Sequence, residues 1–188
     1  MKKDMSLWRQ QRHIPRGLIP PLIAPWLFDV TSLTQRLRQV CPGRFQVRVV
    51  SQKRVRPLRD ERIALRMRDP DHALVRMVYL LCDGQPWVFA RTVIPLRTLS
   101  GVRRRLGRLG IRPLGEMLFA DRSMRRGEVE VARLMPGGKL FGLIAAGAAA
   151  DVTQQPQPIW GRRSVFYLQD KPLLVSEMFL PAINAHDE

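Results

Sequence analysis

The stretch LVRMVYLLCDGQPWVFARTVI, residues 74–94, contains two runs of mainly β-branched, aromatic and other apolar residues on either side of a short polar segment. The polar segment begins with Asp83-Gly84, a pair that favours the backbone conformation of a tight turn. A short Asp-Gly loop between two such runs is a strong signal for a β-hairpin. The sequence therefore predicts strands at residues 74–82 and 87–94.

Further strand patterns lie on both sides of this hairpin. Alternation of apolar and polar residues, or enrichment in β-forming residues, marks residues 45–50, 128–134, 164–168 and 172–179. Most neighbouring strands are joined by loops of hairpin length, and no regular series of helices separates them. These features favour a fold of the α+β class, built on an antiparallel sheet of six strands.

Short helices are predicted outside the strands. Thr31 or Ser32 can cap a helix that extends to Val40. Leucine and valine recur at helical intervals over residues 99–109, and residues 114–119 form a second short helix after them. Two short helices with a tight link are the size of a flap that could cover a sheet.

The chain, residues 1–188, has the length of a single domain with its own hydrophobic core. Four prolines in residues 1–25 rule out one long helix, so this segment is expected to form an irregular N-terminal cover. Residues 136–158 contain a Gly-Gly pair, an alanine run and a Gln/Pro segment, and are expected to form a long flexible loop. We expect the protein to be a monomer.

The cysteines and the N-terminal residues bear on the cellular compartment. Cys41 precedes a Pro-Gly turn and Cys82 lies in an apolar run, with no redox or metal-site spacing, so we expect free, reduced thiols. Charged and polar residues over 8–16 do not match the apolar part of a signal peptide. The longest apolar run, residues 140–150, is too short to span a bilayer. The sequence therefore predicts a cytoplasmic protein with no transmembrane segment.

Positive charge is the unusual property of the composition. The formal net charge is +16, and 27 of the 32 Lys and Arg residues are arginine. Such a charge attracts nucleic acid, anionic membranes and small acidic metabolites alike. The arginines are spread from Arg9 to Arg163 and accompany no zinc-finger, RNA-recognition or clear helix-turn-helix pattern. Specific nucleic-acid binding is therefore not expected.

Two charged residues lie on apolar faces of predicted strands. Arg76 shares its face with Leu74, Val78 and Leu80, and Glu177 shares its face with apolar residues of the strand at 172–179. The opposite faces are also largely apolar, so both groups should be covered and should need a partner or a ligand. Periodicity leaves two interpretations open. One is an Arg76–Glu177 ion pair without function, and the other is a site where arginine binds the carboxylate of an acidic ligand.

Other familiar sites are not indicated. His13, His72 and His186 have no cysteine or carboxylate at ligand spacing, so no metal site is predicted. The sequence Gly137-Gly138-Lys139 lacks the upstream glycine and the following Ser or Thr of a phosphate-binding loop. No dinucleotide fingerprint is present, so no cofactor is expected.

Several segments together resemble the chorismate pyruvate-lyase family of ubiquinone biosynthesis. The resemblance runs in order over about residues 26–182, and the segments are specific as a set. They are LLCDGQPW (80–87), ARTVIP (90–95), TLSG (98–101), PLG (113–115), LF (118–119), WGRRS (160–164) and KPLLVSEMFLPA (171–182).

The resemblance implies a cofactor-free enzyme that converts chorismate to 4-hydroxybenzoate and pyruvate, the first committed step of ubiquinone biosynthesis. It also implies a six-stranded antiparallel sheet with helical flaps that hold product over a buried site. The ligand-contacting arginine and glutamate of the family fall on Arg76 and Glu177, which are the catalytic candidates. The flap contacts fall on Leu114 and on Leu33, where the family has methionine. A contact through the backbone amide would survive that difference.

Two other function classes are considered beside the lyase. Non-catalytic UTRA effector modules of transcription regulators resemble chorismate lyases in fold, but they normally follow a DNA-binding domain. The proline-rich first forty residues are too short and irregular for such a domain. A nucleic-acid-binding protein driven by charge would bind in a steeply salt-dependent way and would ignore chorismate.

Overall fold

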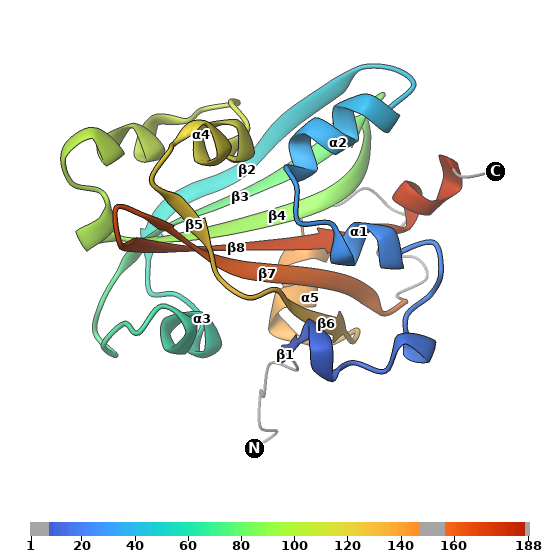
Figure 1. Cartoon of the computed structure of the whole chain (residues 1–188), viewed down its shortest axis with the longest axis horizontal. Helices are drawn as coiled ribbons and strands as arrows, with labels where there is room; N and C mark the ends of the chain where they lie inside the picture. The colour runs from blue at the N-terminus through green and yellow to red at the C-terminus, as the bar shows by residue number, and fades with distance from the viewer. Residues whose placement is uncertain (1–7, 147–156, 187–188) are drawn as a thin grey trace.

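The computed structural model of the chain describes residues 8–146 and 157–186 and shows one antiparallel sheet with helices on both faces (Figure 1). Its strands follow the order β1-β6-β7-β8-β4-β3-β2, with β5 paired to β7. All pairs are antiparallel, which confirms the predicted α+β class. The strands are β1 (Arg9–Gln10), β2 (Phe45–Val55), β3 (Ala73–Cys82), β4 (Gln85–Pro95), β5 (Met124–Arg126), β6 (Glu130–Leu134), β7 (Ile159–Leu168) and β8 (Lys171–Phe179).

The predicted hairpin is confirmed as β3 and β4. Cys82 pairs with Gln85, and the two residues between them, Asp83 and Gly84, have positive φ angles of 47° and 79°. Positive φ at both central residues is what a two-residue turn of type I′ requires. The Asp-Gly pair therefore fixes the register of the hairpin.

The expected number of six strands is wrong, because the sheet has eight. The two additional strands are β1, with two residues, and β5, with three. Segments this short contain less than two periods of alternation, so their sequence cannot be distinguished from that of a loop. They become strands only because a neighbouring strand offers hydrogen-bonding partners.

Ten short helical segments are found in the described residues. Ser32 caps α2, accepting a hydrogen bond from the amide of Gln35 at 3.5 Å, so the helix predicted up to Val40 is confirmed. The predicted helix at residues 99–109 is a 3₁₀ helix, and the one at 114–119 is α4. The segments are α1 (Ala24–Phe28), α2 (Leu33–Val40), α3 (Arg59–Ala64), α4 (Leu114–Ala120), α5 (Lys139–Ala145), η1 (Gln11–His13), η2 (Arg16–Leu18), η3 (Leu96–Thr98), η4 (Gly101–Arg108) and η5 (Pro181–His186).

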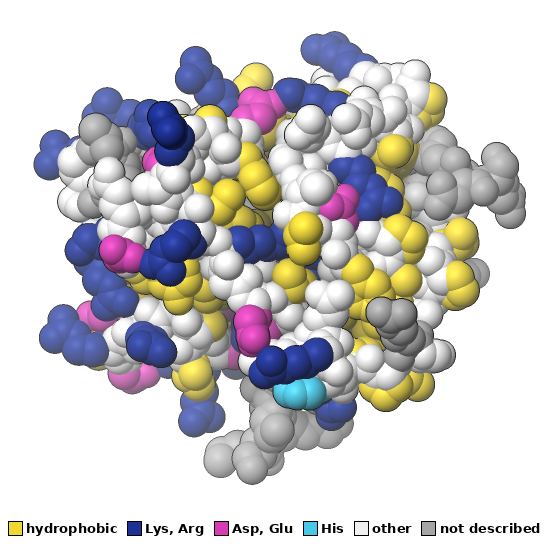
Figure 2. Space-filling view, in the orientation of Figure 1, with side chains coloured by type: hydrophobic (Ala, Val, Ile, Leu, Met, Phe, Trp, Pro, Cys, Tyr) yellow, Lys and Arg dark blue, Asp and Glu magenta, His cyan; other side chains and the backbone are white. Residues whose placement is uncertain are grey.

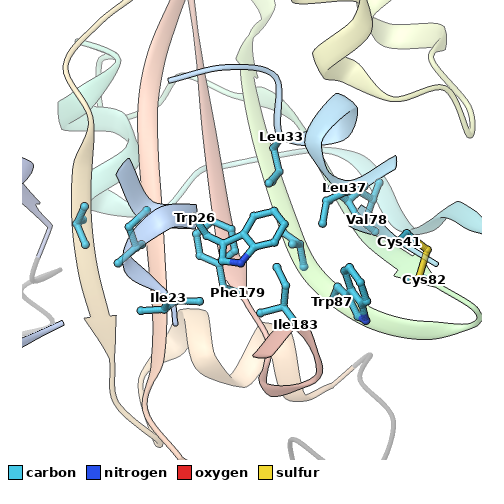
Figure 3. Packing of buried hydrophobic residues seen from close by; sticks show 14 of the residues in the cluster. Ile23, Trp26, Leu33, Leu37, Cys41, Val78, Cys82, Trp87, Phe179 and Ile183 are labelled. Atoms are coloured by element: carbon cyan, nitrogen blue, oxygen red, sulfur yellow. A yellow bond between two sulfur atoms is a disulfide. The ribbon is translucent and has the colours of Figure 1, made fainter. Parts of the chain in front are cut away.

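Helices α2 and α4 lie on one face of the sheet, and α3 and α5 lie on the other (Figure 1). On the α2 side, Leu37 packs in a cluster with Val78, Trp87 and Phe179 (Figure 3). Such coverage of both faces agrees with the apolar character of both faces of the central strands. Arg76 on β3 is thereby buried, and Glu177 on β8 is largely buried.

The expected flexible loop at residues 136–158 is wrong for its first part, because residues 139–145 form α5. Phe141 and Ile144, three residues apart, point their side chains to the same side of this helix and are buried. The hydroxyl of Tyr79 donates a hydrogen bond to the carbonyl of Ile144 at 2.5 Å, which fixes the helix to the sheet. Residues 147–156 of the expected loop lie outside the described residues.

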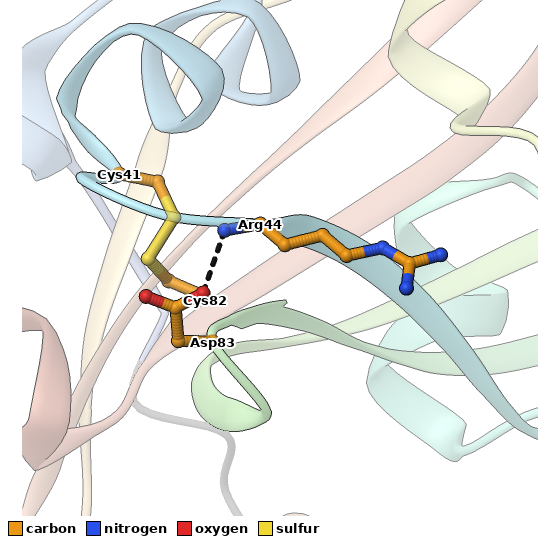
Figure 4. Close-up of a disulfide and its surroundings, with 4 residues drawn as sticks. All are labelled: Cys41, Arg44, Cys82 and Asp83. Carbon is orange, nitrogen blue, oxygen red and sulfur yellow. Dashed lines mark hydrogen bonds between the residues drawn. A yellow bond between two sulfur atoms is a disulfide. The ribbon is translucent and has the colours of Figure 1, made fainter.

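The two cysteines form a disulfide, so the expectation of free thiols is wrong. Cys41 follows the last turn of α2, and Cys82 ends β3, with 5.7 Å between their Cα atoms (Figure 4). The pairing of Phe45 with Cys82 in the sheet brings the chain just before β2 beside the end of β3. Local sequence carried no sign of this contact, because it depends on strand pairing between residues 41 positions apart.

None of the described helices combines the length and apolar character needed to cross a membrane. The basic side chains visible in Figure 2 are scattered over the face instead of gathered into one tract. This distribution agrees with the dispersed arginines of the sequence.

Candidate active site

A pocket lies between the sheet and the two helices α2 and α4. Its non-atom space, including the part open to solvent, is about 580 Å³. Near the centre of the face in Figure 2, basic side chains are recessed between hydrophobic ones. The pocket is lined by Thr31, Leu33, Thr34, Val47, Arg76, Val78, Leu80, Ala90, Thr92, Pro113, Leu114, Gly115, Leu118, Phe119, Arg126, Arg162, Phe166, Val175 and Glu177.

The floor of the pocket consists of side chains on one face of four neighbouring strands. Together with Ser164 next to them, which is not itself a lining residue, these residues fall into two rows that run across β3, β4, β8 and β7, two residues apart along each strand. Side chains two residues apart in a strand point the same way, so both rows face α2 and α4. One row is Arg76, Thr92, Val175 and Ser164, and the other is Val78, Ala90, Glu177 and Arg162.

Arg76 is buried in the floor, with 2% of its surface exposed. Its Nη2 donates hydrogen bonds to the carbonyls of Gly110 at 2.9 Å and Arg112 at 3.2 Å, in the segment that leads into α4. Its Nε is buried and has no hydrogen-bond partner in the described part of the chain. Burial lowers the pKa of the guanidinium, since the charged form is desolvated. A buried cation with an unused donor is a suitable site for an anionic ligand.

Glu177 also lines the pocket, but its ionic partner is Arg162 and not Arg76. Arg162 Nε donates to Glu177 Oε2 at 2.6 Å, across the β7–β8 pair. The hypothesis of an Arg76–Glu177 ion pair is therefore wrong. The pairing follows from strand order, because β4 separates the strand of Arg76 from that of Glu177, whereas β7 is adjacent to β8.

Arg162 makes three hydrogen bonds within the protein, through Nε and Nη1. Besides Glu177, its Nη1 donates to the carbonyls of Trp26, at 2.8 Å, and Asp29. Its side chain is 1% exposed, whereas that of Glu177 is 17% exposed. Arg162 therefore holds one oxygen of the carboxylate, while Glu177 Oε1 accepts no hydrogen bond from the described residues and faces a space that a ligand can fill.

Leu33 and Leu114 cover the pocket from above. Each is the first residue of its helix, α2 and α4 respectively, and each is buried. The amides of a first helical turn have no partner within the helix and are available to an anion. A Cβ built on Gly115 would lie 3.2 Å from Ser32 Oγ and from Thr34 Oγ1, so glycine lets the two helices approach closely.

All four residues predicted as site residues thus lie at one pocket, and two arginines were missed. Arg162 could have been found, because extending the alternation of residues 164–168 backwards puts it on the same strand face as Ser164 and Phe166. No sequence pattern indicated that Arg126 lies at the pocket, because its strand β5 has only three residues.

Arg126 lines the side of the pocket and is partly buried. Its Nε donates to Ser164 Oγ and its Nη1 to the carbonyl of Val30, both at 3.0 Å. Its guanidinium lies 5.3 Å from the centre of the Phe166 ring. Burial lowers the pKa of Arg126, and the nearby positive charge of Arg162 adds to this effect.

Within residues 8–146 and 157–186, no group of three or more His, Cys, Asp or Glu side chains is arranged to hold a metal ion. The charged groups of the pocket are instead guanidinium groups and one carboxylate, set among apolar side chains. The chemistry open to this arrangement is binding and orientation of a small anion, with Glu177 as hydrogen-bond acceptor or proton carrier.

Solved structures with a similar fold include ligand-binding parts of bacterial regulators. A GntR-family transcriptional regulator from Bacillus cereus gives a TM-score of 0.52 at 14% identity, covering 73% of this chain and 92% of that one. The effector-binding domain of the trehalose repressor of Bacillus subtilis gives a TM-score of 0.50 at 7% identity, covering 71% and 89%. Likeness at such low identity shows the fold alone.

Sequence comparison distinguishes the enzyme family from these regulators. A protein named "Probable chorismate pyruvate-lyase" in Methylococcus capsulatus is 43% identical over 158 residues, covering 84% of this chain and 94% of the relative. A protein of the same name in Azoarcus sp. is 45% identical over 162 residues, covering 86% and 85%. The family model described as chorismate lyase matches residues 3–187. The chain therefore belongs to the chorismate lyase family.

Proposed function

We propose that this protein is a chorismate pyruvate-lyase, which converts chorismate to 4-hydroxybenzoate and pyruvate. The single observation that carries the assignment to this pocket is the pair of polar groups on its floor that lack a partner in the described residues. Arg76 has a buried Nε without a partner, and Glu177 has one oxygen held by Arg162 and the other open. One group donates to a carboxylate, and the other accepts from a hydroxyl.

The charge of the pocket supports a doubly anionic substrate. Arg76, Arg126 and Arg162 line it together with one carboxylate, that of Glu177, which leaves two positive charges in excess. Chorismate carries two carboxylates, one on the ring and one on the enolpyruvyl group. Binding this dianion neutralises the excess charge in a partly desolvated space, where electrostatic attraction is stronger than in water.

In the proposed binding mode, Arg76 and the first amides of α4 and α2, at Leu114 and Leu33, bind the ring carboxylate. Glu177 Oε1 accepts a hydrogen bond from the ring hydroxyl. Because Arg162 fixes Oε2 of the same carboxylate, the orientation of Glu177 is set before the substrate binds. The apolar floor residues, such as Val78 and Ala90, contact the ring.

The reaction breaks the bond between the ring carbon and the ether oxygen of the enolpyruvyl group. The hydrogen on the hydroxyl-bearing ring carbon is lost as a proton, and the ring becomes aromatic. The enolpyruvate that leaves takes up a proton and becomes pyruvate. Since aromatisation makes the reaction downhill, the protein's main contribution is orientation and electrostatic stabilisation. Glu177 is the group in this pocket that can assist movement of the proton.

The reaction as written needs no cofactor, and we propose that none is used. Activity should survive dialysis against a chelator, and restoration of lost activity by a divalent metal would contradict this.

The protein's proposed role is in ubiquinone biosynthesis in the cytoplasm, as a monomer without specific nucleic-acid binding. Cell fractionation and size-exclusion chromatography test the location and the oligomeric state.

Incubation of the purified protein with chorismate tests the function directly. Ultraviolet absorbance should show 4-hydroxybenzoate accumulating, and an enzymatic assay should show pyruvate in equal amount. A folded protein that forms neither product would refute the proposal. An effector module of the UTRA type would instead bind a small acid and leave it unchanged.

A further inference from the structure

We propose that Arg126 is the residue that binds the enolpyruvyl carboxylate of the substrate and so distinguishes chorismate from ring acids with a single carboxylate. This inference rests on the proposed function, since it takes chorismate to be the ligand of the pocket. It assigns to the two ends of the substrate two different arginines, Arg76 for the ring carboxylate and Arg126 for the carboxylate that leaves with pyruvate.

The partners that Arg162 and Arg126 already have within the protein support this assignment. Arg162 already has the carboxylate of Glu177 as its ionic partner, and its side chain is only 1% exposed, so it is poorly placed to bind a second anion. Arg126 uses Nε for the hydroxyl of Ser164 and Nη1 for the carbonyl of Val30. Its Nη2 donates to none of the described residues. Arg126 is thus held in a fixed orientation with one nitrogen available.

Arg126 also lacks an acidic partner. No carboxylate in the described residues lies within the 4.0 Å of an ion pair with it. Burial and the neighbouring charge of Arg162 disfavour its cationic form, and the charges of Glu177 and Asp29 offset these effects only in part, so a bound carboxylate would favour that form further. Arg162, which also lines the pocket, has Glu177 as its carboxylate partner, whereas Arg76 and Arg126 have none among the described residues. The carboxylate that Arg126 lacks is one that a ligand can supply.

The position of Arg126 fits the second end of a dicarboxylate. Arg76 begins a floor row that continues through Thr92 and Val175 to Ser164, and Ser164 holds the Arg126 guanidinium. Three strand spacings separate the backbones of Arg76 and Ser164, which is about 14 Å. The side chains of Arg76 and Arg126 both line the pocket between these ends. A ring with a carboxylate on either side can lie between the two guanidinium groups.

The alternative is a structural role, in which Arg126 only ties β5 to Ser164 and to the segment before α2. Stability measurements alone cannot separate the two roles, because both predict some loss on substitution. Ligands can separate them, because 4-hydroxybenzoate keeps the ring carboxylate and hydroxyl but lacks the enolpyruvyl carboxylate. A carboxylate-binding role therefore affects chorismate and spares 4-hydroxybenzoate.

The test compares Arg126→Gln with the unaltered protein. Steady-state kinetics should show KM for chorismate raised roughly ten- to hundredfold, the loss expected for a charge-assisted hydrogen bond. Calorimetric titration should show 4-hydroxybenzoate binding close to that of the unaltered protein. Arg125→Gln is the matched control, because Arg125 is the neighbouring residue on β5, is 66% exposed and pairs with Asp170. It should leave both measurements unchanged.

Equal losses for chorismate and 4-hydroxybenzoate, or no loss for either, would overturn the assignment of Arg126. If the unaltered protein forms no product from chorismate, the proposed function itself fails, so the two failures are distinguishable.

Should Arg126→Gln not fold, Arg126→Lys is titrated with 3-(carboxymethoxy)-4-hydroxybenzoate, a stable dicarboxylate with the substitution pattern of chorismate. The lysine variant should bind this dicarboxylate more weakly than the unaltered protein and 4-hydroxybenzoate equally well. The same affinity for the dicarboxylate in both proteins would refute the proposal.

Discussion

Arg162 on β7 and Glu177 on β8 are directly paired across neighbouring strands and form an ion pair of 2.6 Å at the floor of the pocket. The arginine is buried and bound to two backbone carbonyls, so it is a fixed support for the carboxylate. Arg162 thereby orients Glu177, whereas Arg76 forms no ion pair with Glu177. This separation of the two predicted catalytic residues makes their roles testable one at a time.

Glu177→Gln should lower kcat roughly 10²- to 10⁴-fold, because the amide cannot carry a proton and holds the ring hydroxyl less well. The variant should still fold, at a cost of about 1–3 kcal/mol in the free energy of unfolding, since Arg162 loses its charged partner. Steady-state kinetics and urea denaturation measure the two effects. Glu128→Gln, at a carboxylate that is 58% exposed and outside the pocket, serves as control. Unchanged kcat in a folded Glu177→Gln protein would exclude Glu177 from catalysis.

Arg76→Ala should weaken the binding of both chorismate and 4-hydroxybenzoate, because both carry the ring carboxylate. The expected loss is about 1.5–3 kcal/mol for each ligand, seen as a raised KM and a raised Kd. Arg76→Lys should retain only part of the binding affinity that Arg76→Ala loses, since an ammonium lacks the planar fork that binds a carboxylate at two points. Wild-type kinetics in Arg76→Ala would show that Arg76 serves only to hold the carbonyls of Gly110 and Arg112.

Product release, not bond breaking, should limit turnover, because α2 and α4 cover the pocket and the product keeps the contacts to Arg76 and Glu177. Rapid-mixing experiments should show a first turnover equal in amount to the enzyme, followed by a slower steady state, and added 4-hydroxybenzoate should inhibit. Arg38→Ala removes an exposed ion pair to Glu116 that joins the two helices. The pair is worth at most about 1 kcal/mol, so the steady-state rate should rise no more than about fivefold. A linear progress curve without inhibition by product would contradict this mechanism.

The Cys41–Cys82 disulfide should stabilise the protein by about 4 kcal/mol, the loop-closure value for cysteines 41 residues apart. Urea denaturation with and without a reductant measures the difference, and the Cys41→Ser, Cys82→Ser double variant should match the reduced protein. Disulfides are typical of oxidising compartments, so thiol labelling in fresh cell lysate also bears on the proposed cytoplasmic location. Identical unfolding curves under both conditions would show that the bond adds nothing.

The local sequence determined the elements whose signals lie within a few residues. Asp83-Gly84 predicted the β3–β4 hairpin, because a two-residue turn with positive φ is encoded by the turn residues themselves. Alternation placed Arg76 and Glu177 on apolar faces, because side-chain direction in a strand depends only on the residue's place in the period. The resemblance to a known family then linked these residues with Leu33 and Leu114, and the structure brings all four to one pocket.

Only the tertiary structure decided which residues meet. Glu177 pairs with Arg162 because β7 lies beside β8, and Cys41 meets Cys82 because β2 lies beside β3. Arg126 reaches the pocket through a three-residue strand that exists only beside β7. Periodicity specifies the face of a strand but neither its neighbours nor its register. Those depend on packing and on hydrogen bonds between segments far apart in the chain.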